Sequence, residues 1–258
     1  MDYSFLDPLK ANPGRSGVLS DLDGTLSPIA PTPGEARVGG EARRHLRLLN
    51  SSYGLVAVVS GRPASEAMGL VGIGELVYSG NHGLELLSGG ETRTYNDARY
   101  FREGIREVLE AVSKFRFQGV TIEDKGIGRF AVHYRNSCEP GIREQIEHLL
   151  ERATCHTGLV VKEGRMVFEV RPPLTVDKGE AVSGLCRGYG LEGAVYLGDD
   201  LTDIDAFRGI RESGMDTGIC IAVDSPESPE GLKESADIVL PSQEDVMGVL
   251  GYLASGSD

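Results

Sequence analysis

The sequence predicts an α/β fold, with a Rossmann-like parallel-sheet core that is interrupted by a second, α+β domain. Near both ends of the chain, short apolar runs alternate with segments of helical periodicity, as in parallel sheets that are covered by helices. Between residues 89 and 173, apolar and polar residues alternate within the runs, which is typical of half-exposed antiparallel strands.

The core elements follow in order along the chain. We expect a first strand over 17–21, a helix over 41–50 and a central strand over 54–60, which is apolar almost throughout. A short helix over 63–71 and a strand over 75–80 complete the first part. The second part has expected helices over 178–190, 201–210 and 242–254, and strands over 194–199, 218–223 and 237–240.

The interrupting segment has a different pattern. It contains expected helices over 97–114 and 139–153 and four strands, over 117–125, 128–135, 158–164 and 165–172. The junctions "LSGGE" and "RPP" flank it. We therefore expect a discontinuous core of residues 1–88 and 174–258, and an inserted domain of residues 89–173.

Composition excludes several classes of function. The 258 residues carry a formal net charge of −13, and so acidic a chain repels nucleic acid and anionic lipid. No apolar run approaches the roughly 20 residues of a membrane span, and the N-terminus lacks a signal-peptide pattern. We expect reduced thiols in a cytoplasm, because the four cysteines, Cys138, Cys155, Cys186 and Cys220, are widely spaced and form no CxxC pair. We also expect a monomer.

Asp21 and Asp23 stand at the end of the first strand, where α/β sheets bind their ligands. Residues two apart in an extended chain point the same way, so both carboxylates can face one crevice. Like charges held close cost energy, which a nearby cation offsets. Asp23–Gly24 is also a common β-turn pair, but a turn does not account for Asp21.

Polar residues also mark the next strand end and the start of a later helix. Ser60 closes the central strand, where it either meets a ligand or caps the following helix, with Pro63 at the first helical position. Asp177 and Glu180 predict a capping box, which places Lys178 at a helix start, where the helix dipole disfavours a cation. Lys178 is therefore either functional or simply solvated.

A cluster of acids, Asp199, Asp200, Asp203 and Asp205, follows a later strand. Helix N-termini favour acids, which accounts for Asp203 and Asp205 better than for Asp199. Together with the first two aspartates, this set of oxygen ligands favours Mg²⁺ and a phosphate. One carboxylate can attack phosphorus, and a second can protonate the leaving oxygen and then deprotonate the attacking water.

Four motifs, "DLDGTL", "VVSGR", "DKG" and "GDDLTD", resemble in this order those of the haloacid dehalogenase superfamily of phosphohydrolases. The inserted domain resembles the cap of its α/β-capped class. Longer stretches between about residues 17 and 208, such as "SGNHGLEL", "EDKGIGRFAVHYR" and "FEVRPPLTVDKGEAV", resemble trehalose-6-phosphate phosphatases. One departure is Ile204, where that family commonly has an acid.

The resemblance implies a role for each matching residue. Asp21 would be the nucleophile and Asp23 the acid/base, while Ser60 and Lys178 would hold the phosphate. Mg²⁺ would be bound by Asp21, the backbone carbonyl of Asp23 and Asp199, with Asp200 and Asp203 supporting these ligands.

The resemblance also implies a substrate site. Arg62 and His82 lie in substrate-side motifs, and Glu123, Lys125 and Glu169 match positions that bind sugar hydroxyls. Without the resemblance, His82, between Asn81 and Gly83, is equally well interpreted as a turn residue. Likewise, residues 123–125 would be interpreted as a solvated strand end.

The function implied is Mg²⁺-dependent hydrolysis of trehalose 6-phosphate to trehalose and phosphate through a phosphoaspartate. Two alternatives keep the core chemistry: a phosphatase of another sugar phosphate, such as sucrose phosphate or a glycosyl-glycerate phosphate, and a phosphomutase. A third is a non-catalytic subunit of a trehalose-synthesis enzyme. The presence of Asp21, Asp23, Lys178 and Asp199 argues against this third alternative.

Overall fold

The computed structural model describes residues 2–30, 35–94, 101–124, 128–164, 166–173, 176–226 and 228–256. The chain forms two compact units, Met1–Arg93 with Val176–Asp258, and Thr94–Thr175. The first boundary lies later than residue 88, because a pair of strands that the sequence analysis missed, β4 (Glu85–Ser88) and β5 (Glu91–Thr94), extends the core sheet. The second boundary falls at Val176 rather than at residue 174.

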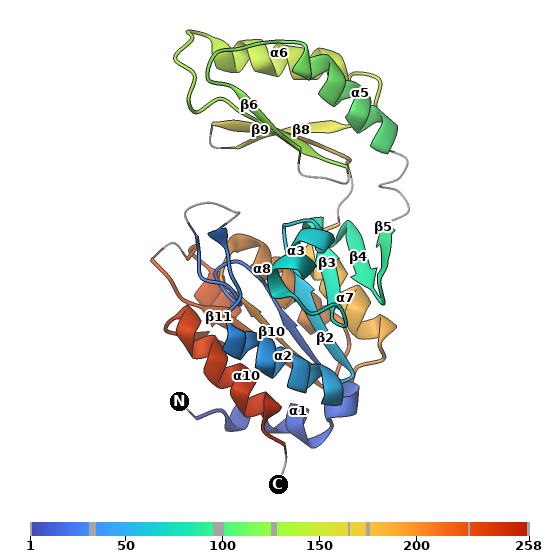
Figure 1. Ribbon diagram of the computed structural model, residues 1–258, viewed down its shortest axis with the longest axis vertical. Helices are drawn as coiled ribbons and strands as arrows, with labels where there is room; N and C mark the ends of the chain where they lie inside the picture. The colour runs from blue at the N-terminus through green and yellow to red at the C-terminus, as the bar shows by residue number, and fades with distance from the viewer. Residues whose placement is uncertain are drawn as a thin grey trace. The chain divides into compact units, whose positions relative to one another are not determined.

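The first unit is built on an eight-stranded sheet (Figure 1). Its strands lie in the order β12 (Ile238–Leu240), β11 (Thr217–Val223), β10 (Gly193–Gly198), β1 (Ser16–Ser20), β2 (Leu55–Val59), β3 (Val77–Gly80), β4 and β5. The strands from β12 to β3 are parallel, which confirms the predicted core, and β4 runs antiparallel to β3.

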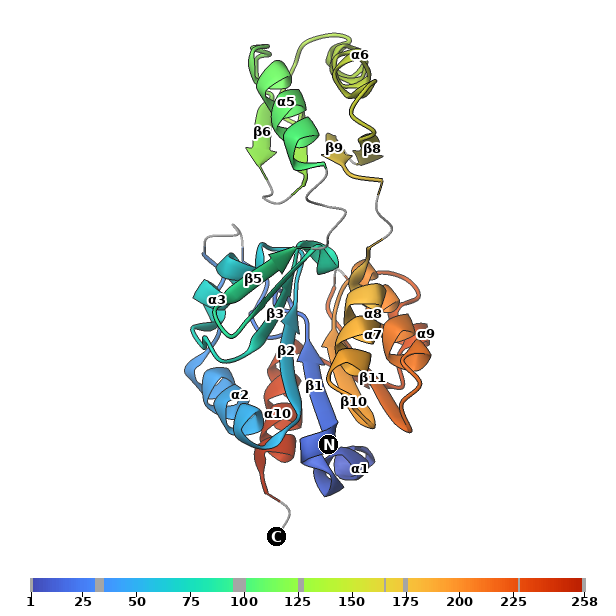
Figure 2. The ribbon, with the colours of Figure 1, turned by 90° about the vertical axis from the view of Figure 1, so that its right-hand side faces the viewer.

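Helices cover both faces of this sheet (Figure 2). Neighbouring residues of β1 point to opposite faces, so Val18 and Leu19 belong to two separate apolar clusters. The Val18 cluster takes side chains from α1 (Asp7–Ala11), α2 (Gly40–Ser52), α3 (Ala64–Val71) and α10 (Val246–Ala254). The Leu19 cluster takes them from α7 (Lys178–Gly188), α8 (Leu201–Glu212) and α9 (Leu232–Ser235). Short 3₁₀ helices span Ser4–Leu6, Pro13–Arg15, Asn81–Gly83 and Gln243–Asp245.

Two glycines bring α7 and α8 into direct backbone contact. A Cβ on Gly209 would lie 2.2 Å from the carbonyl oxygen of Gly179, so no side chain fits between the helices there. This close approach sets the first residue of α7, Lys178, against the first turn of α8, which carries Asp203.

The second unit is a four-stranded antiparallel sheet with two helices. The strands lie in the order β6 (Thr121–Asp124), β7 (Phe130–His133), β9 (Val167–Arg171) and β8 (Val160–Gly164). Apolar residues on one face, such as Val132 and Phe168, pack with Val108 of α5 (Arg102–Ser113) and Ile146 of α6 (Ile142–Thr154). The antiparallel pattern predicted from alternation is confirmed.

No helix in the described ranges combines the length and the apolar character that crossing a bilayer would require.

Candidate active site

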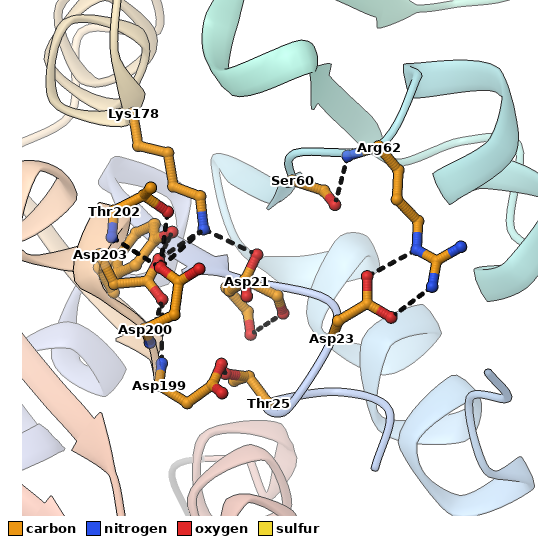
Figure 3. A network of polar contacts seen from close by, with 12 residues as sticks. Asp21, Asp23, Thr25, Ser60, Arg62, Lys178, Asp199, Asp200, Thr202 and Asp203 are labelled. Carbon is orange, nitrogen blue, oxygen red and sulfur yellow. Dashed lines mark hydrogen bonds and ion pairs between the residues drawn. The ribbon is translucent and has the colours of Figure 1, made fainter. Parts of the chain in front are cut away.

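A buried ion pair joins the end of β1 to the start of α7. Asp21 follows Ser20 and donates its backbone N–H to the Leu197 carbonyl of β10 (2.8 Å), which fixes the residue at the carboxyl edge of the sheet. Its carboxylate forms an ion pair with Lys178 Nζ at 2.9 Å (Figure 3). Asp21 and Lys178 are 5% and 1% exposed, so the interpretation of Lys178 as a solvated lysine is wrong. The Asp177 half of the predicted capping box is confirmed, since the Asp177 side chain accepts from the Glu180 N–H.

Asp203 holds this pair in place. One of its oxygens accepts from Lys178 Nζ (2.8 Å) and the Tyr196 hydroxyl (2.7 Å), and the other from the backbone N–H groups of Asp199 (2.9 Å) and Asp200 (3.0 Å). A carboxylate has about four lone-pair sites, so these donors saturate it. Asp203 therefore supports the site as a scaffold. Tyr196 was missed, because in the sequence it is one more aromatic residue in an apolar strand.

Asp199 completes the acidic cluster. One carboxylate oxygen from each of Asp21, Asp199 and Asp203 lies within 4.8 Å of the others. Asp199 accepts from the Thr25 hydroxyl at 3.1 Å. Gly24 has a φ of +82°, and a Cβ there would lie 2.0 Å from Asp199 Oδ2, so only glycine allows the β1 loop to approach this carboxylate so closely.

The cluster carries more negative than positive charge. Three buried carboxylates face one ammonium, which leaves two negative charges uncompensated when all are ionised. Burial raises the pKa of Asp21 well above its ordinary value and that of Asp199 to about 7. Burial opposes the charge of Lys178 as well, but Asp21 and Asp203 outweigh it, so the pKa of Lys178 is raised.

A divalent cation fits this donor set. Asp21 and Asp199 are close together and, within the described part of the chain, each accepts from a single side chain, Lys178 or Thr25. Carboxylate oxygens with spare lone pairs and two surplus negative charges match the preferences of Mg²⁺.

Asp200 lies at the rim of the cluster. It caps α8 by accepting from the Thr202 N–H at 2.7 Å, and it forms a capping box with Asp203. Burial opposes its charge, but Lys178, 4.0 Å away, and the bonds from Thr202 outweigh this, so the pKa of Asp200 is lowered. Like Asp203, Asp200 stabilises the start of α8.

Asp23 has its own cation. The Arg62 guanidinium donates from Nε to Asp23 Oδ2 (2.6 Å) and from Nη2 to Oδ1 (2.7 Å), as Figure 3 shows. Hydrogen bonding to Asp23 raises the pKa of Arg62. The sequence analysis assigned Arg62 to the substrate and missed this pair. Asp21 and Asp23 are thus compensated separately, by Lys178 and by Arg62.

Ser60 is buried at the end of β2, beside Arg62. Its hydroxyl accepts from the Arg62 N–H at 3.1 Å and makes no cap to α3. The helix begins at Ala64 with Pro63 as the residue before it, so the predicted Ser60 cap and the predicted proline at the first helical position are both wrong.

The turn after β3 supports the Ser60 loop. Asn81 and His82 have left-handed backbones (φ 51° and 55°), which is the turn conformation that the sequence allowed for His82. Their N–H groups donate to the carbonyls of Arg62 (2.8 Å) and Ser60 (3.0 Å). A Cβ on Gly61 would lie 2.8 Å from His82 Nε2, so the imidazole packs on this loop.

Glu85 is a second buried residue that the sequence analysis missed. Its carboxylate is 5% exposed and accepts from the Ala64 N–H (2.6 Å) and from Asn81 Nδ2 (2.9 Å). It therefore ties the start of α3 to the turn after β3. An acid within the apolar run "LELL" was the available signal.

The sugar-site candidates belong to the second unit. Glu123 and Glu169 each pair in register with Ala131, one from either side, so they lie on the same face of the four-stranded sheet. Glu123 meets His133 Nε2 at 2.8 Å, and Glu169 lies 3.7 Å from Arg129 Nη1. Lys125 lies outside the described residues.

Comparisons with known proteins agree with the geometry. Trehalose-phosphate phosphatase B of Arabidopsis thaliana is 31% identical to this chain over 243 residues, which cover 86% of this chain and 62% of that protein. The chain thus spans less than two thirds of that relative's length. A crystal structure of Aspergillus fumigatus trehalose-6-phosphate phosphatase superposes with a TM-score of 0.68 at 25% identity, covering 100% of this chain and 98% of that one.

A haloacid dehalogenase-like hydrolase from Bacteroides thetaiotaomicron has the same fold, with a TM-score of 0.60 at 15% identity over 92% of this chain and 99% of that one. The predicted fold, a Rossmann-like parallel-sheet core with an inserted α+β domain, is thereby confirmed. The model of the trehalose-phosphatase family matches residues 19–239, which include all of the second unit and most of the first. The chain belongs to the trehalose-phosphatase family.

Proposed function

We propose that this protein is a Mg²⁺-dependent phosphatase that hydrolyses trehalose 6-phosphate to trehalose and phosphate. The observation that carries the proposal is the buried Asp21, held by Lys178 at 2.9 Å and next to Asp199 at the carboxyl edge of the parallel sheet. A nucleophilic carboxylate in contact with a buried ammonium is suited to attack a phosphate, whose charge the ammonium offsets.

The reaction proceeds in two displacements. An oxygen of Asp21 attacks phosphorus, the bond from phosphorus to the sugar oxygen breaks, and Asp23 gives that oxygen a proton. Asp23 then takes a proton from water, which attacks the phosphoaspartate and releases phosphate and free Asp21. Ser60 and Lys178 hold the phosphate oxygens. Because Arg62 occupies both oxygens of Asp23, at least one of these bonds opens before Asp23 acts.

Asp21, the backbone carbonyl of Asp23 and Asp199 would hold the Mg²⁺ ion. When bound, the ion supplies positive charge that offsets the charges of the phosphate and the two carboxylates. Asp200 and Asp203 keep Lys178 and the start of α8 in place around it.

We assign substrate contacts to both units. Arg62 and His82 stand beside Ser60 and serve the phosphate end of the substrate. Glu123, Lys125 and Glu169 serve the sugar hydroxyls, which carboxylates and ammonium groups bind through charge-assisted hydrogen bonds.

We also place the protein in the cytoplasm as a monomer. All four cysteines are free, two exposed and two buried, as expected in a reducing compartment.

The test is phosphate release by the purified chain, with Mg²⁺ and with EDTA. Trehalose 6-phosphate is compared with sucrose phosphate, a glycosyl-glycerate phosphate, glucose 6-phosphate and p-nitrophenyl phosphate. We expect a preference of orders of magnitude for trehalose 6-phosphate and no release in EDTA. If another sugar phosphate is preferred, the assignments of Glu123, Lys125 and Glu169 are wrong, and if none is hydrolysed, the protein is not a phosphatase.

Two substitutions separate chemistry from recognition. Asp21→Asn removes the nucleophile, and we expect no detectable turnover of any substrate with an unchanged circular dichroism spectrum. Near-wild-type turnover by this variant would exclude the phosphoaspartate. Glu123→Gln should raise KM for trehalose 6-phosphate but not for p-nitrophenyl phosphate. Asp124→Asn, the next residue and on the other face of β6, is its control.

A further inference from the structure

The Arg62 guanidinium is shared between two acids. Its Nε and Nη2 donate to Asp23, and its Nη1 donates to Glu66, four residues later in the first turn of α3. The Arg62 side chain is 13% exposed, whereas that of Glu66 is 47% exposed. Glu66 thus stands on the solvent side of Arg62, and Asp23 on the side of the site.

The backbone on either side of this contact is fixed. The Arg62 N–H donates to Ser60 Oγ, and its carbonyl accepts from the Asn81 N–H. The start of α3 is held by Glu85, which accepts from the Ala64 N–H at 2.6 Å. Glu66 therefore projects from a helix start that is held by hydrogen bonds, toward an arginine whose backbone is held as well.

A free arginine side chain samples many rotamers, and fixing it in one of them costs conformational entropy. Among the described residues, Asp23 accepts from Nε and Nη2 of the guanidinium, and Glu66 accepts from Nη1. When the bonds to Asp23 open during turnover, Glu66 keeps the guanidinium near its place and keeps its charge paired.

We propose that Glu66 is a positioning residue of the reaction, which acts by holding Arg62 in register with Asp23. The inference rests on the proposed function in one respect, namely that Asp23 is the acid/base. Glu66 touches neither the nucleophile nor the metal-binding carboxylates; it acts through Arg62.

Two ordinary explanations compete with this role. An acid in the first turn of a helix is favoured by the helix dipole, and an i,i+4 ion pair stabilises a helix. Both would make α3 slightly more stable, but neither would couple Glu66 to turnover through Arg62. The test must therefore measure the coupling between Glu66 and Arg62 as well as the loss of kcat when Glu66 is replaced.

The experiment is a double-mutant cycle on kcat, measured with Mg²⁺ on trehalose 6-phosphate and on p-nitrophenyl phosphate. Glu66→Ala is made in the wild-type and Arg62→Ala backgrounds, with Arg62→Lys as the background if the alanine variant is too slow. Glu212→Ala is the matched control, because Glu212 forms the same kind of i,i+4 pair with Arg208 on α8, at 3.3 Å.

We expect Glu66→Ala to lower kcat by about fivefold in the wild-type background and by less than about 1.5-fold when Arg62 is replaced, as the loss of a half-exposed ion pair predicts. Glu66→Asp should recover part of the loss, and Glu212→Ala should change kcat by less than about 1.5-fold. An equal loss in both backgrounds, or no loss in the wild type, overturns the proposal. Failure of the wild type on trehalose 6-phosphate rejects the proposed substrate instead, and the cycle is then read on p-nitrophenyl phosphate.

Discussion

The scaffold role of Asp203 makes a quantitative prediction for Asp203→Asn. The aspartate accepts from two backbone N–H groups on one oxygen and from Lys178 and Tyr196 on the other. An asparagine has one oxygen, so if that oxygen keeps the backbone bonds, its amide nitrogen faces the ammonium. The charged bond is worth about 1.5–3 kcal/mol and the tyrosine bond up to about 1 kcal/mol. We expect the free energy of unfolding to fall by roughly 2–4 kcal/mol, near the range for breaking a buried ion pair.

The assay is urea unfolding in EDTA, followed by far-UV circular dichroism because the chain has no tryptophan. The control is Asp205→Asn, two residues further along α8, whose carboxylate meets the half-exposed Arg208 at 3.5 Å. A pair of this kind contributes less than about 1 kcal/mol. If Asp203→Asn destabilises the protein no more than Asp205→Asn does, the four bonds to Asp203 do not hold the site together.

Two further predictions concern groups away from the site. Burial lowers the pKa of His45 below 6.5, so His45 binds a proton less readily in the folded protein than in the unfolded chain. The contribution of neutral His45 to the free energy of unfolding is therefore complete above pH 6.5 and is lost as the pH falls through the lowered pKa. Urea unfolding at pH 7.5 and 5.5 should show a smaller drop for His45→Gln than for the wild type, and equal drops would contradict this. Of the four thiols, Cys138 and Cys155 are exposed, while burial raises the pKa of Cys186 and Cys220 to about 12, so a disulfide reagent should titrate two thiols in the native protein and four in urea.

Where burial dominates, the sequence was sufficient to predict the structure. The central strands are buried on both faces, so their apolar runs identify them directly, and their parallel order follows from the helices between them. The hairpin of β4 and β5 was missed because "ETRT" has no apolar face, and its place at the sheet edge is set by pairing alone.

Some residues of the site could be predicted from the sequence, and others could not. Residues at strand ends, such as Asp21, Ser60 and Asp199, were predicted from position, because parallel strands bring their carboxyl ends to one edge. The contact of Lys178 with Asp203 also depends on the close approach of two helices at Gly179 and Gly209, which no local pattern shows.

The sequence pattern did not predict the direction in which the Arg62 and Glu85 side chains point, and so it missed their contacts. Arg62 reaches Asp23 because α3 starts two residues after it and because a left-handed turn at Asn81 clamps its carbonyl. Neither the length of the loop before α3 nor the turn conformation at Asn81 follows from the residue pattern. Arg62, between a glycine and a proline, was therefore predicted only as a substrate residue.

The two aspartates after β1 differ in their exposure to solvent and in their charged partners, and this difference fits their proposed roles. Asp21 is buried and shares its surroundings with surplus negative charge, so its carboxylate is desolvated and needs an added cation, as suits a nucleophile for a phosphate. The Asp23 side chain is 38% exposed, so a leaving group and water can reach it once its bonds to Arg62 open. Two equal carboxyl groups that occupy such unlike environments can be assigned to different steps, and the assignment follows from what surrounds each one.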